Sequence, residues 1–295
     1  MHMTLFRIAF RKARGFLTIT SIGAILAMPQ AIAAQNNSAN AFADYLHQQG
    51  EYYRAISEYQ ESLFLRASSL EDSCYCYLKI ASCYYRGKDY EGLIAFAHAT
   101  RPRLAGHDSA LRTFNNYEGL GYLHSGSPSL AGWYFQQNKN HDESALLLGI
   151  AKLYLADWTP AREGFLKLTA SRDPEIAAKA ARMSVVAQDG EQIGRKNPLC
   201  AGVLSALVPG AGYLYTKNYQ TAASALILNA LFLGSSLEFH EKGFELVSIT
   251  SFAVAFGWYA GNVFGSAESA KRYNRSKRHS LIDTALDEDN ILSQY

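Results

Sequence analysis

The stretch Gly50-Glu51-Tyr52-Tyr53-Arg54-Ala55-Ile56, with Tyr59 and Leu63 after it, shows the pattern from which much of this chain is built. A glycine and an acidic residue predict a turn. Small and aromatic side chains then recur at the three- and four-residue spacing of one helix face. Further turns follow at spacings of 38, 38 and 30 residues from Tyr52, at positions Tyr90, Pro128 and Trp158.

A small residue lies nine positions before each of these turn positions, on the preceding helix: Ala43, Ala81, Gly119 and Gly149. Small residues allow two helices to approach closely, and aromatic residues fill the space between helical hairpins. A single hairpin cannot bury its apolar face, whereas stacked hairpins can. Residues 39–190 are therefore predicted to form an all-α solenoid of helical hairpins, which ends in an alanine-rich capping helix after Pro174.

These residues resemble the tetratricopeptide repeat family, most closely over residues 50–63. The second unit departs from the family pattern, because Leu93 replaces a small residue and Ala97 replaces an aromatic one. The resemblance implies a concave groove, lined by the first helix of each pair, that holds an extended protein or peptide partner. Carried over unit by unit, the groove positions are Asp44, His47, Gln48, Ser82, Tyr85, Arg86, Asn116, His124, Ile150 and Tyr154. The alternative is that these residues form ordinary solvated helix faces.

The first 33 residues have the order of a secretory signal peptide. A basic start with no acidic residue precedes an uncharged stretch, 15–28, and the small-residue pattern Ala31-Ile32-Ala33. The basic residues are Arg7, Arg11, Lys12 and Arg14. Cleavage is expected after Ala33 or Ala34. An uncleaved signal anchor is the alternative, and either form would export the residues that follow.

Residues 198–274 are predicted to form a membrane module. Within them, three uncharged stretches lie at 199–216, 221–237 and 246–267. Crossing the hydrocarbon core takes about 20 apolar residues, so the second and third stretches are candidate spans. The first stretch is interrupted by Pro209, and its unbroken apolar part is too short to cross alone. A buried helical hairpin of a soluble domain is the alternative.

The phrase Leu207-Val208-Pro209-Gly210-Ala211-Gly212-Tyr213-Leu214-Tyr215 precedes the two candidate spans. It resembles the two-transmembrane-helix domain family, in which a Pro-Gly-x-Gly-x-x-Tyr phrase comes before a hydrophobic hairpin. The resemblance implies membrane location and no assigned chemistry. Pro209 would end a helix, and the two glycines would allow a tight reversal. A phosphate-binding loop is disfavoured, because the GxxxxGK[ST] phrase is absent.

Asn229 and Asn262 are polar residues deep within the second and third stretches. Buried amides in a bilayer usually form hydrogen bonds between helices, so a contact between Asn229 and Asn262 is expected. A substrate or ion path is the alternative. The many small residues of these stretches favour close helix packing, which would also support a homo-oligomer through the membrane helices.

The chain that follows the third stretch is first basic and then acidic. Three crossings after an exported repeat domain would bring its basic residues into the cytoplasm, as the positive-inside tendency favours. These residues are Lys271, Arg272, Arg275, Lys277 and Arg278. The alternative is two spans with a re-entrant first stretch. Residues 275–295, which end acidic, are predicted to form a disordered polar tail.

No residue pattern indicates catalysis, a metal or a cofactor. Cys74, Cys76 and Cys83 lie on one predicted helix without a nearby histidine, so they are interpreted as packing residues rather than zinc ligands. A redox role or a disulfide to another chain is the alternative. No nucleophile phrase G-x-S-x-G occurs. The near balance of 28 Lys+Arg against 26 Asp+Glu argues against nucleic-acid binding.

These patterns together predict a non-enzymatic scaffold in the bacterial inner (cytoplasmic) membrane, with a repeat domain that is exported to the periplasm and binds a protein or peptide. The alternative is a non-enzymatic membrane subunit of a transport or envelope-assembly machine. In that alternative the Pro-Gly-Ala-Gly segment and the hairpin are the active part, and the repeats only recruit.

Overall fold

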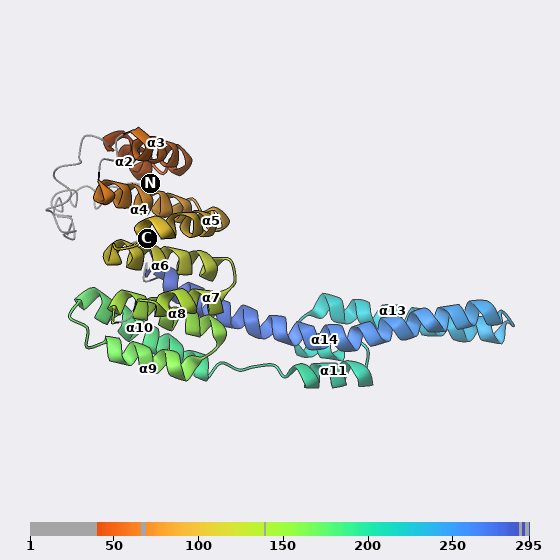
Figure 1. The fold of residues 1–295 in the computed structure, drawn as a ribbon. Helices are drawn as coiled ribbons and strands as arrows, with labels where there is room; N and C mark the ends of the chain where they lie inside the picture. The colour runs from red at the N-terminus through yellow and green to blue at the C-terminus, as the bar shows by residue number, and fades with distance from the viewer. Residues whose placement is uncertain (1–39, 66–68, 139, 289–290, 293–294) are drawn as a thin grey trace, which may run out of the picture.

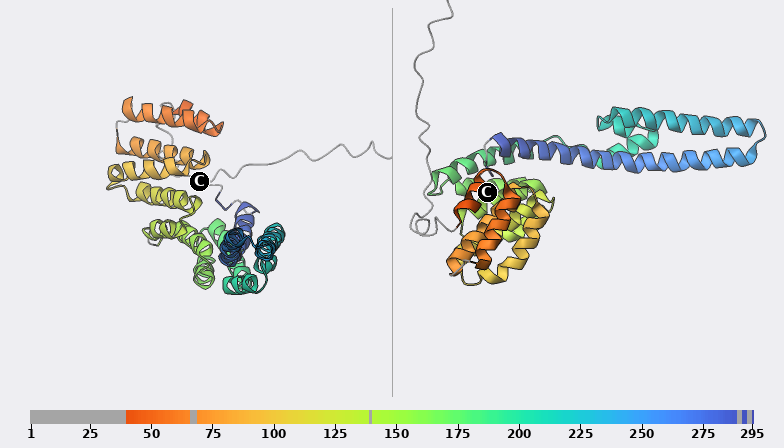
Figure 2. Two further views of the ribbon diagram at one scale, coloured as in Figure 1. Left: turned by 90° about the vertical axis from the view of Figure 1, so that its right-hand side faces the viewer. Right: turned by 90° about the horizontal axis from the view of Figure 1, so that it is seen from above.

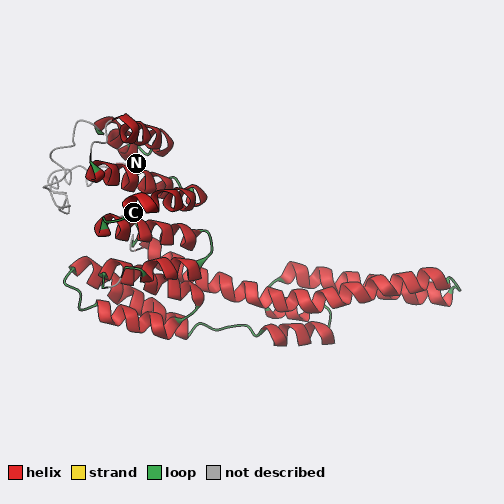
Figure 3. Cartoon of the chain, in the orientation of Figure 1, coloured by secondary structure: helices red, strands yellow, loops and turns green. Residues whose placement is uncertain are grey.

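The computed structural model describes residues 40–65, 69–138, 140–288, 291–292 and 295. Every regular element within these ranges is a helix, and none is a strand (Figure 3). The prediction of an all-α fold is therefore confirmed. The predicted signal peptide, residues 1–33, lies outside the described residues.

Helical hairpins stack on one another to form a curved array over residues 40–191 (Figure 1). Neighbouring helices pair along the chain, from α2 with α3 to α8 with α9, and α10 covers the end of the stack. The elements are α2 (Ala41–Gln48), α3 (Tyr52–Leu65), α4 (Leu70–Arg86), α5 (Tyr90–Thr100), the 3-10 helix η1 (Arg101–Leu104), α6 (Asp108–His124), α7 (Pro128–Gln136), α8 (Asp142–Leu155), α9 (Trp158–Leu168) and α10 (Pro174–Glu191).

The turns within the four hairpins share one backbone feature. Two positions before each predicted turn position, the residue has a positive φ: Gly50 at 79°, Lys88 at 59°, Gly126 at 78° and Ala156 at 66°. Their spacing equals that of the turn positions in the sequence. Glycine adopts this region at no steric cost, and other residues adopt it singly where a helix ends.

The glycines of the third and fourth hairpins lie directly against an aromatic ring of the partner helix. A β-carbon on Gly119 would overlap the ring of Phe135, and one on Gly149 would overlap the ring of Phe165. Both phenylalanines are fully buried. The small residues therefore let α6 approach α7, and α8 approach α9, until the rings fill the space between them.

A second body of four helices follows α10: α11 (Pro198–Leu207), α12 (Ala211–Tyr215), α13 (Tyr219–Glu241) and α14 (Glu245–Glu288). α13 and α14 pair as a long hairpin that projects away from the array (Figure 2). Both are long and apolar enough to cross a membrane by length and composition. α11 has 10 residues and is about 15 Å long, half of the roughly 30 Å hydrocarbon core, so it cannot cross alone.

The tail that was expected to be disordered, residues 275–295, is ordered over its described part. α14 continues without a break to Glu288, so one helix belongs both to the hairpin and to the surface of the array (Figure 1). Ile282, Leu286 and Ile291 are buried in one cluster with the core of the array. The prediction is wrong because apolar side chains at i, i+4 spacing outweigh the acidic charge once the array offers a surface to cover them.

The docked tail brings both ends of the hairpin module back to the array. The Lys196 N–H donates to Asn274 Oδ1, and Asn274 Nδ2 donates to the Lys196 carbonyl, each at 2.8 Å. A chain that leaves and returns on one side of a bilayer crosses it an even number of times. With the hairpin in a bilayer, this arrangement fits the two-span alternative, in which α11 and α12 do not cross, and does not fit three crossings.

Candidate functional site

The concave face of the array is the candidate site, and the C-terminal segment of the chain lies on it (Figure 2). Ser82 Oγ and Arg86 Nε both donate hydrogen bonds to the main-chain oxygen of Tyr295, at 3.2 and 3.1 Å. His47 Nε2 lies 3.1 Å from Ser82 Oγ. These residues come from α2 and α4, which are the first helices of their hairpins.

Aromatic side chains surround Tyr295. The rings of Tyr85 and Tyr117 meet its ring at centroid distances of 6.2 and 5.7 Å, both edge-on. The Tyr295 hydroxyl donates to Glu143 Oε1 at 2.5 Å. Edge-to-face aromatic pairs and a hydrogen bond to a carboxylate are among the stronger polar and aromatic contacts available to a peptide. Two aromatic rings and one carboxylate of the groove therefore contact the Tyr295 side chain.

The helical part of the segment meets the fourth hairpin. The Tyr154 hydroxyl donates to a carboxylate oxygen of Asp283, and its ring packs edge-on against His279 at 5.2 Å. Burial, followed by the hydrogen bond to Asp283, raises the pKa of Tyr154. Burial lowers the pKa of both His124 and His279 against the opposing effect of Asp283, so both imidazoles are neutral near pH 7.

The structure brings together most of the groove residues predicted from the sequence. His47 reaches the segment through Ser82, and His124 Nε2 lies 3.2 Å from the Tyr85 hydroxyl oxygen. The predicted residues that contact the segment directly are Ser82, Tyr85, Arg86 and Tyr154. The segment is helical as far as Glu288, whereas the resemblance implied an extended peptide.

Two predicted groove residues lie inside the array instead. Asn116 is buried, and its Oδ1 accepts hydrogen bonds from Ser144 Oγ at 2.8 Å and Asn138 Nδ2 at 3.0 Å. Ile150 is fully buried in the core. The residue after Asn116, Tyr117, faces the groove. The carried-over register is therefore wrong by one position on α6.

The first hairpin contributes less to the occupied groove than expected. The Asp44 carboxylate accepts hydrogen bonds from the hydroxyls of Tyr59 and Tyr75, at 2.5 and 2.7 Å. Burial and then these hydrogen bonds raise the pKa of both tyrosines. Gln48 is exposed at the end of α2. Asp44 therefore joins α2, α3 and α4, and does not touch the segment in the groove.

Several residues that make contacts in the groove were not predicted from the sequence. Tyr117 and Glu143 contact Tyr295, and Asp283 of the tail contacts Tyr154. The tail sequence does contain a pattern typical of a helix with one apolar face, because Leu281 with Ala285 and Ile282 with Leu286 are apolar pairs at i, i+4 spacing.

The Pro-Gly-Ala-Gly segment forms the junction of α11, α12 and α14. Gly210 has a φ of 91°, which residues with a side chain rarely adopt. A β-carbon on Gly212 would overlap the Ala201 carbonyl oxygen and lie 2.7 Å from both Ser205 Oγ and Ser266 Cβ. The Gly212 N–H donates to Ser205 Oγ at 3.0 Å. Glycine thus lets three helices meet where no side chain fits.

The tyrosines of the same phrase join this junction to its surroundings. Tyr213 is buried, and its hydroxyl occupies the space that a β-carbon on Gly265 would need. The Tyr215 hydroxyl accepts a hydrogen bond from the Asn197 N–H at 3.2 Å, and its ring lies 4.3 Å from Lys196 Nζ. Every contact described for these two tyrosines packs helices and linker together.

Asn229 and Asn262 do not form the expected hydrogen bond. Asn229 Nδ2 donates at 2.7 Å to a carbonyl one turn earlier in its own helix, and Asn262 Nδ2 is buried without a hydrogen-bond partner. Ser236 and Ser248 bond to each other across the hairpin. Asn229 lies seven residues before Ser236 and Ala255 lies seven residues after Ser248, so Asn229 and Ala255 are at the same level of the hairpin. Asn262 lies seven residues further along α14, about 10 Å from that level along the helix axis.

The three cysteines of α4 are buried free thiols. Burial raises the pKa of Cys74, and it raises the pKa of Cys76 to about 11 and of Cys83 to about 12. The thiols therefore stay protonated near pH 7, and a protonated thiol is a poor nucleophile and metal ligand. Among the residues that the structure describes, no group of three or more His, Cys, Asp or Glu side chains could hold a metal ion.

Glu118 of α6 is a buried charge that the sequence pattern does not single out. Arg101 donates a hydrogen bond to its carboxylate, and His98 Nε2 lies 3.4 Å from Oε1. Arg101 also donates to Asn115 Oδ1 at 2.8 Å. The charge is paired within the array, so it connects η1 to α6.

Comparisons with models of protein families and with curated proteins find no match to this chain. The two patterns noted in the sequence therefore stay resemblances. The groove and the hairpin module are therefore the features that bear on the function of this chain.

Proposed function

We propose that this chain is a membrane-anchored scaffold of the bacterial envelope, in which a tetratricopeptide-like array binds a protein or peptide segment in its concave groove. The observation that supports the proposal is the groove already filled by a segment of the chain itself, through side chains that the repeat pattern marks as partner-binding. The proposal includes no catalytic step and no cofactor.

The contacts of the bound segment support one kind of partner, an amphipathic helix. An amphipathic helix would place apolar side chains where Ile282 and Leu286 lie, and an acidic side chain where Asp283 meets Tyr154. Helix-in-groove binding of this kind is read as i, i+4 anchors. The chain's own segment competes with the partner, so the apparent affinity falls in proportion to the fraction of molecules with an open groove.

The hairpin is proposed to anchor the array in the inner membrane. Large apolar side chains on α13 and α14 are exposed in the isolated chain, among them Leu231, Ile249, Phe256 and Phe264. An apolar surface of this extent is unfavourable in water and favourable in lipid. The signal-like N-terminus would export the array to the periplasm, and the first such segment usually dominates orientation even where basic residues disagree.

Site-specific photocross-linking in intact cells tests the scaffold proposal. A photoreactive residue replaces Tyr85 in the groove of the full-length chain, and as a control it replaces Tyr53, which is exposed on α3. We expect a discrete adduct with another protein at position 85 and none at 53. Adducts only with the chain's own tail, even in an Ile282→Ala variant in which docking of the tail is weakened, would contradict a partner-binding groove.

Topology is tested by fusing alkaline phosphatase, and separately a cytoplasm-active fluorescent protein, after residue 190 and after residue 295. We expect phosphatase activity and no fluorescence at both positions. Fluorescence at both positions would place the array in the cytoplasm and overturn the export proposal. Opposite signals at the two positions would contradict the docked tail and restore three crossings.

A further inference from the structure

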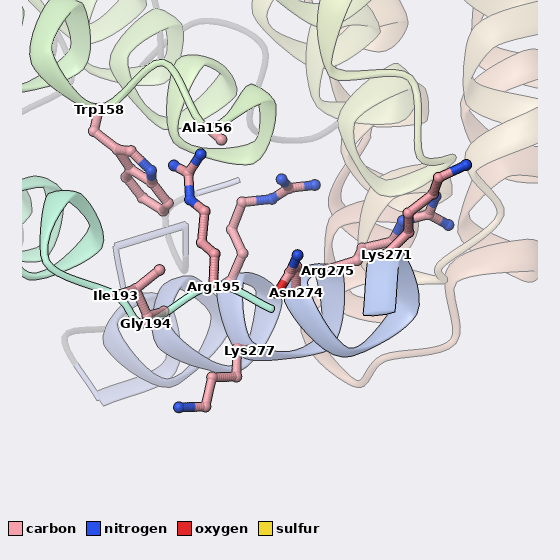
Figure 4. A pocket seen from close by; sticks show the side chains of 10 residues that line it. Ala156, Trp158, Ile193, Gly194, Arg195, Lys271, Asn274, Arg275 and Lys277 are labelled. Atoms are coloured by element: carbon pink, nitrogen blue, oxygen red, sulfur yellow. The ribbon is translucent and has the colours of Figure 1, made fainter. Parts of the chain in front are cut away.

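A basic cavity of about 300 Å³ lies where α14 passes from the hairpin to the array (Figure 4). Its walls come from three parts of the chain. Trp158 and Ala156 belong to the fourth hairpin, and Arg195 belongs to the linker after α10. α14 supplies four cationic side chains, Lys271, Arg275, Lys277 and Arg278. The cavity therefore exists only because the tail docks on the array.

Positive charge in this cavity is concentrated and largely uncompensated. Lys271 pairs with Glu268 at 3.3 Å, but no ion pair of the described residues involves Arg195, Arg275 or Arg278, and no carboxylate lines the cavity. Burial, and then the nearby Arg275 and Arg195, lower the pKa of Arg278. Such proximity of like charges costs free energy that an anion would relieve.

Two buried N–H groups of the cavity residues lack a partner. Arg278 Nε and Trp158 Nε1 are both buried without a hydrogen bond. In Figure 4 the Trp158 indole lies beside the Arg195 side chain. Buried donors are nearly always satisfied in folded proteins, so these two N–H groups favour a ligand that brings a hydrogen-bond acceptor.

The position of the cavity relative to the hairpin indicates where that acceptor comes from. The uncharged stretch of α14 ends at Ala267. At 1.5 Å per residue, Lys271 lies about 6 Å beyond this end and Arg278 about 16 Å beyond it. With the hairpin in a bilayer, the cavity opens at the headgroup level and just above it.

We propose that this cavity binds the phosphate of an anionic phospholipid headgroup, from the leaflet on the array side. Guanidinium groups match phosphate oxygens with paired hydrogen bonds, and the cavity holds one such group from the linker, Arg195, and another from α14, Arg278. A bound headgroup would stabilise the junction between array and hairpin, because its contacts need both. The proposal rests on the membrane placement given above.

Native mass spectrometry of the full-length protein, released from nanodiscs that mix phosphatidylglycerol and phosphatidylcholine, tests the site. We expect retained phosphatidylglycerol in preference to phosphatidylcholine, and about a tenfold loss of this preference in the Arg195→Gln/Arg278→Gln double variant. Arg272→Gln is the control, because Arg272 is an exposed cation of the same helix that does not line the cavity. Arg278→Lys keeps the charge and should restore part of the preference.

Each other result overturns a stated part of the proposal. An equal loss in Arg272→Gln would show a diffuse surface charge instead of a site. Displacement of the lipid by inorganic phosphate, or by glycerol phosphate at equal concentration, would assign the cavity to a soluble phosphate compound. No lipid preference in protein that resists carbonate extraction would overturn the cavity alone. Release by carbonate would overturn the membrane placement, and the lipid assignment with it.

Discussion

Replacing Ile282 by alanine should release the C-terminal segment from the groove while leaving the array folded. Ile282 has 0% of its surface exposed and packs in the core cluster shared by α14 and the array. The change removes three carbon atoms, each worth about 0.8 kcal/mol on burial, and the cavity left behind brings the total to about 2–5 kcal/mol. Docking of the segment should weaken by this amount.

Hydrogen exchange of the full-length protein in nanodiscs measures the effect. A loss of about 2.4 kcal/mol corresponds to about a 60-fold fall in the protection of amides in residues 278–288, if this segment opens locally. Ser280→Ala, on the exposed side of the same helix, is the control and should change protection little. The array residues, such as those of α6, should keep their protection.

Two outcomes would refute this reasoning. Unchanged protection of residues 278–288 would mean that Ile282 does not hold the segment in place. An equal fall in protection throughout α4, α6 and α8 would mean that the segment is part of one cooperative unit with the array, and not a removable occupant of the groove. The expected outcome also opens the groove, so the photocross-linking at Tyr85 described above should increase in the same variant.

Three further predictions concern the array and the junction. Gly212→Val should cost several kcal/mol and abolish stable assembly of α11 with α14, which a thermal shift in detergent will detect, whereas Gly257→Ala, with open space around it, should not. Phe165→Ala should lower the free energy of unfolding of the array by about 3–5 kcal/mol in urea titration; a loss below about 1 kcal/mol would contradict its tight packing on Gly149. Burial, followed by the charges of Lys79 and Arg86, lowers the pKa of His47 to about 4 in the folded state, and Asp44 opposes this shift. In the unfolded state the pKa of His47 is about 6.5, so the unfolded chain takes up a proton before the folded chain does as the pH falls. Between pH 7 and pH 5 the protein should lose about 1 kcal/mol of stability, after allowance for the half-exposed ring, and His47→Gln should lose correspondingly less.

The repeat spacing was readable from the sequence because it reflects local geometry. A small residue, a turn and an aromatic residue at fixed distances predict a close-packed hairpin, and Gly149 with Phe165 shows the packing that results. The candidate spans were readable for a similar reason, since length and absence of charge are enough to identify them. Neither prediction needs knowledge of which helices meet.

The groove register and the polar contacts of the hairpin were only partly readable. Asn116 and Tyr117 are neighbours in sequence, and which of them faces inward depends on the rotation of α6 against α7 and α8. Asn229 and Asn262 have similar depth in their own stretches, but the register of the hairpin separates them. Rotation and register are set by packing between helices, which no single stretch contains.

The amino-acid pattern was therefore sufficient for the all-α class, the spacing of the hairpins and the apolar character of the C-terminal module, because each depends on residues close together in the chain. The docking of residues 278–288 and of Tyr295 on the concave face was decided by tertiary structure, since its contacts join Ser82, Arg86 and Tyr154 to residues that follow more than a hundred positions later. The same docking creates the basic cavity. The docking and the cavity depend on the surface that the stacked hairpins form, because an amphipathic helix is stabilised only when another surface covers its apolar face.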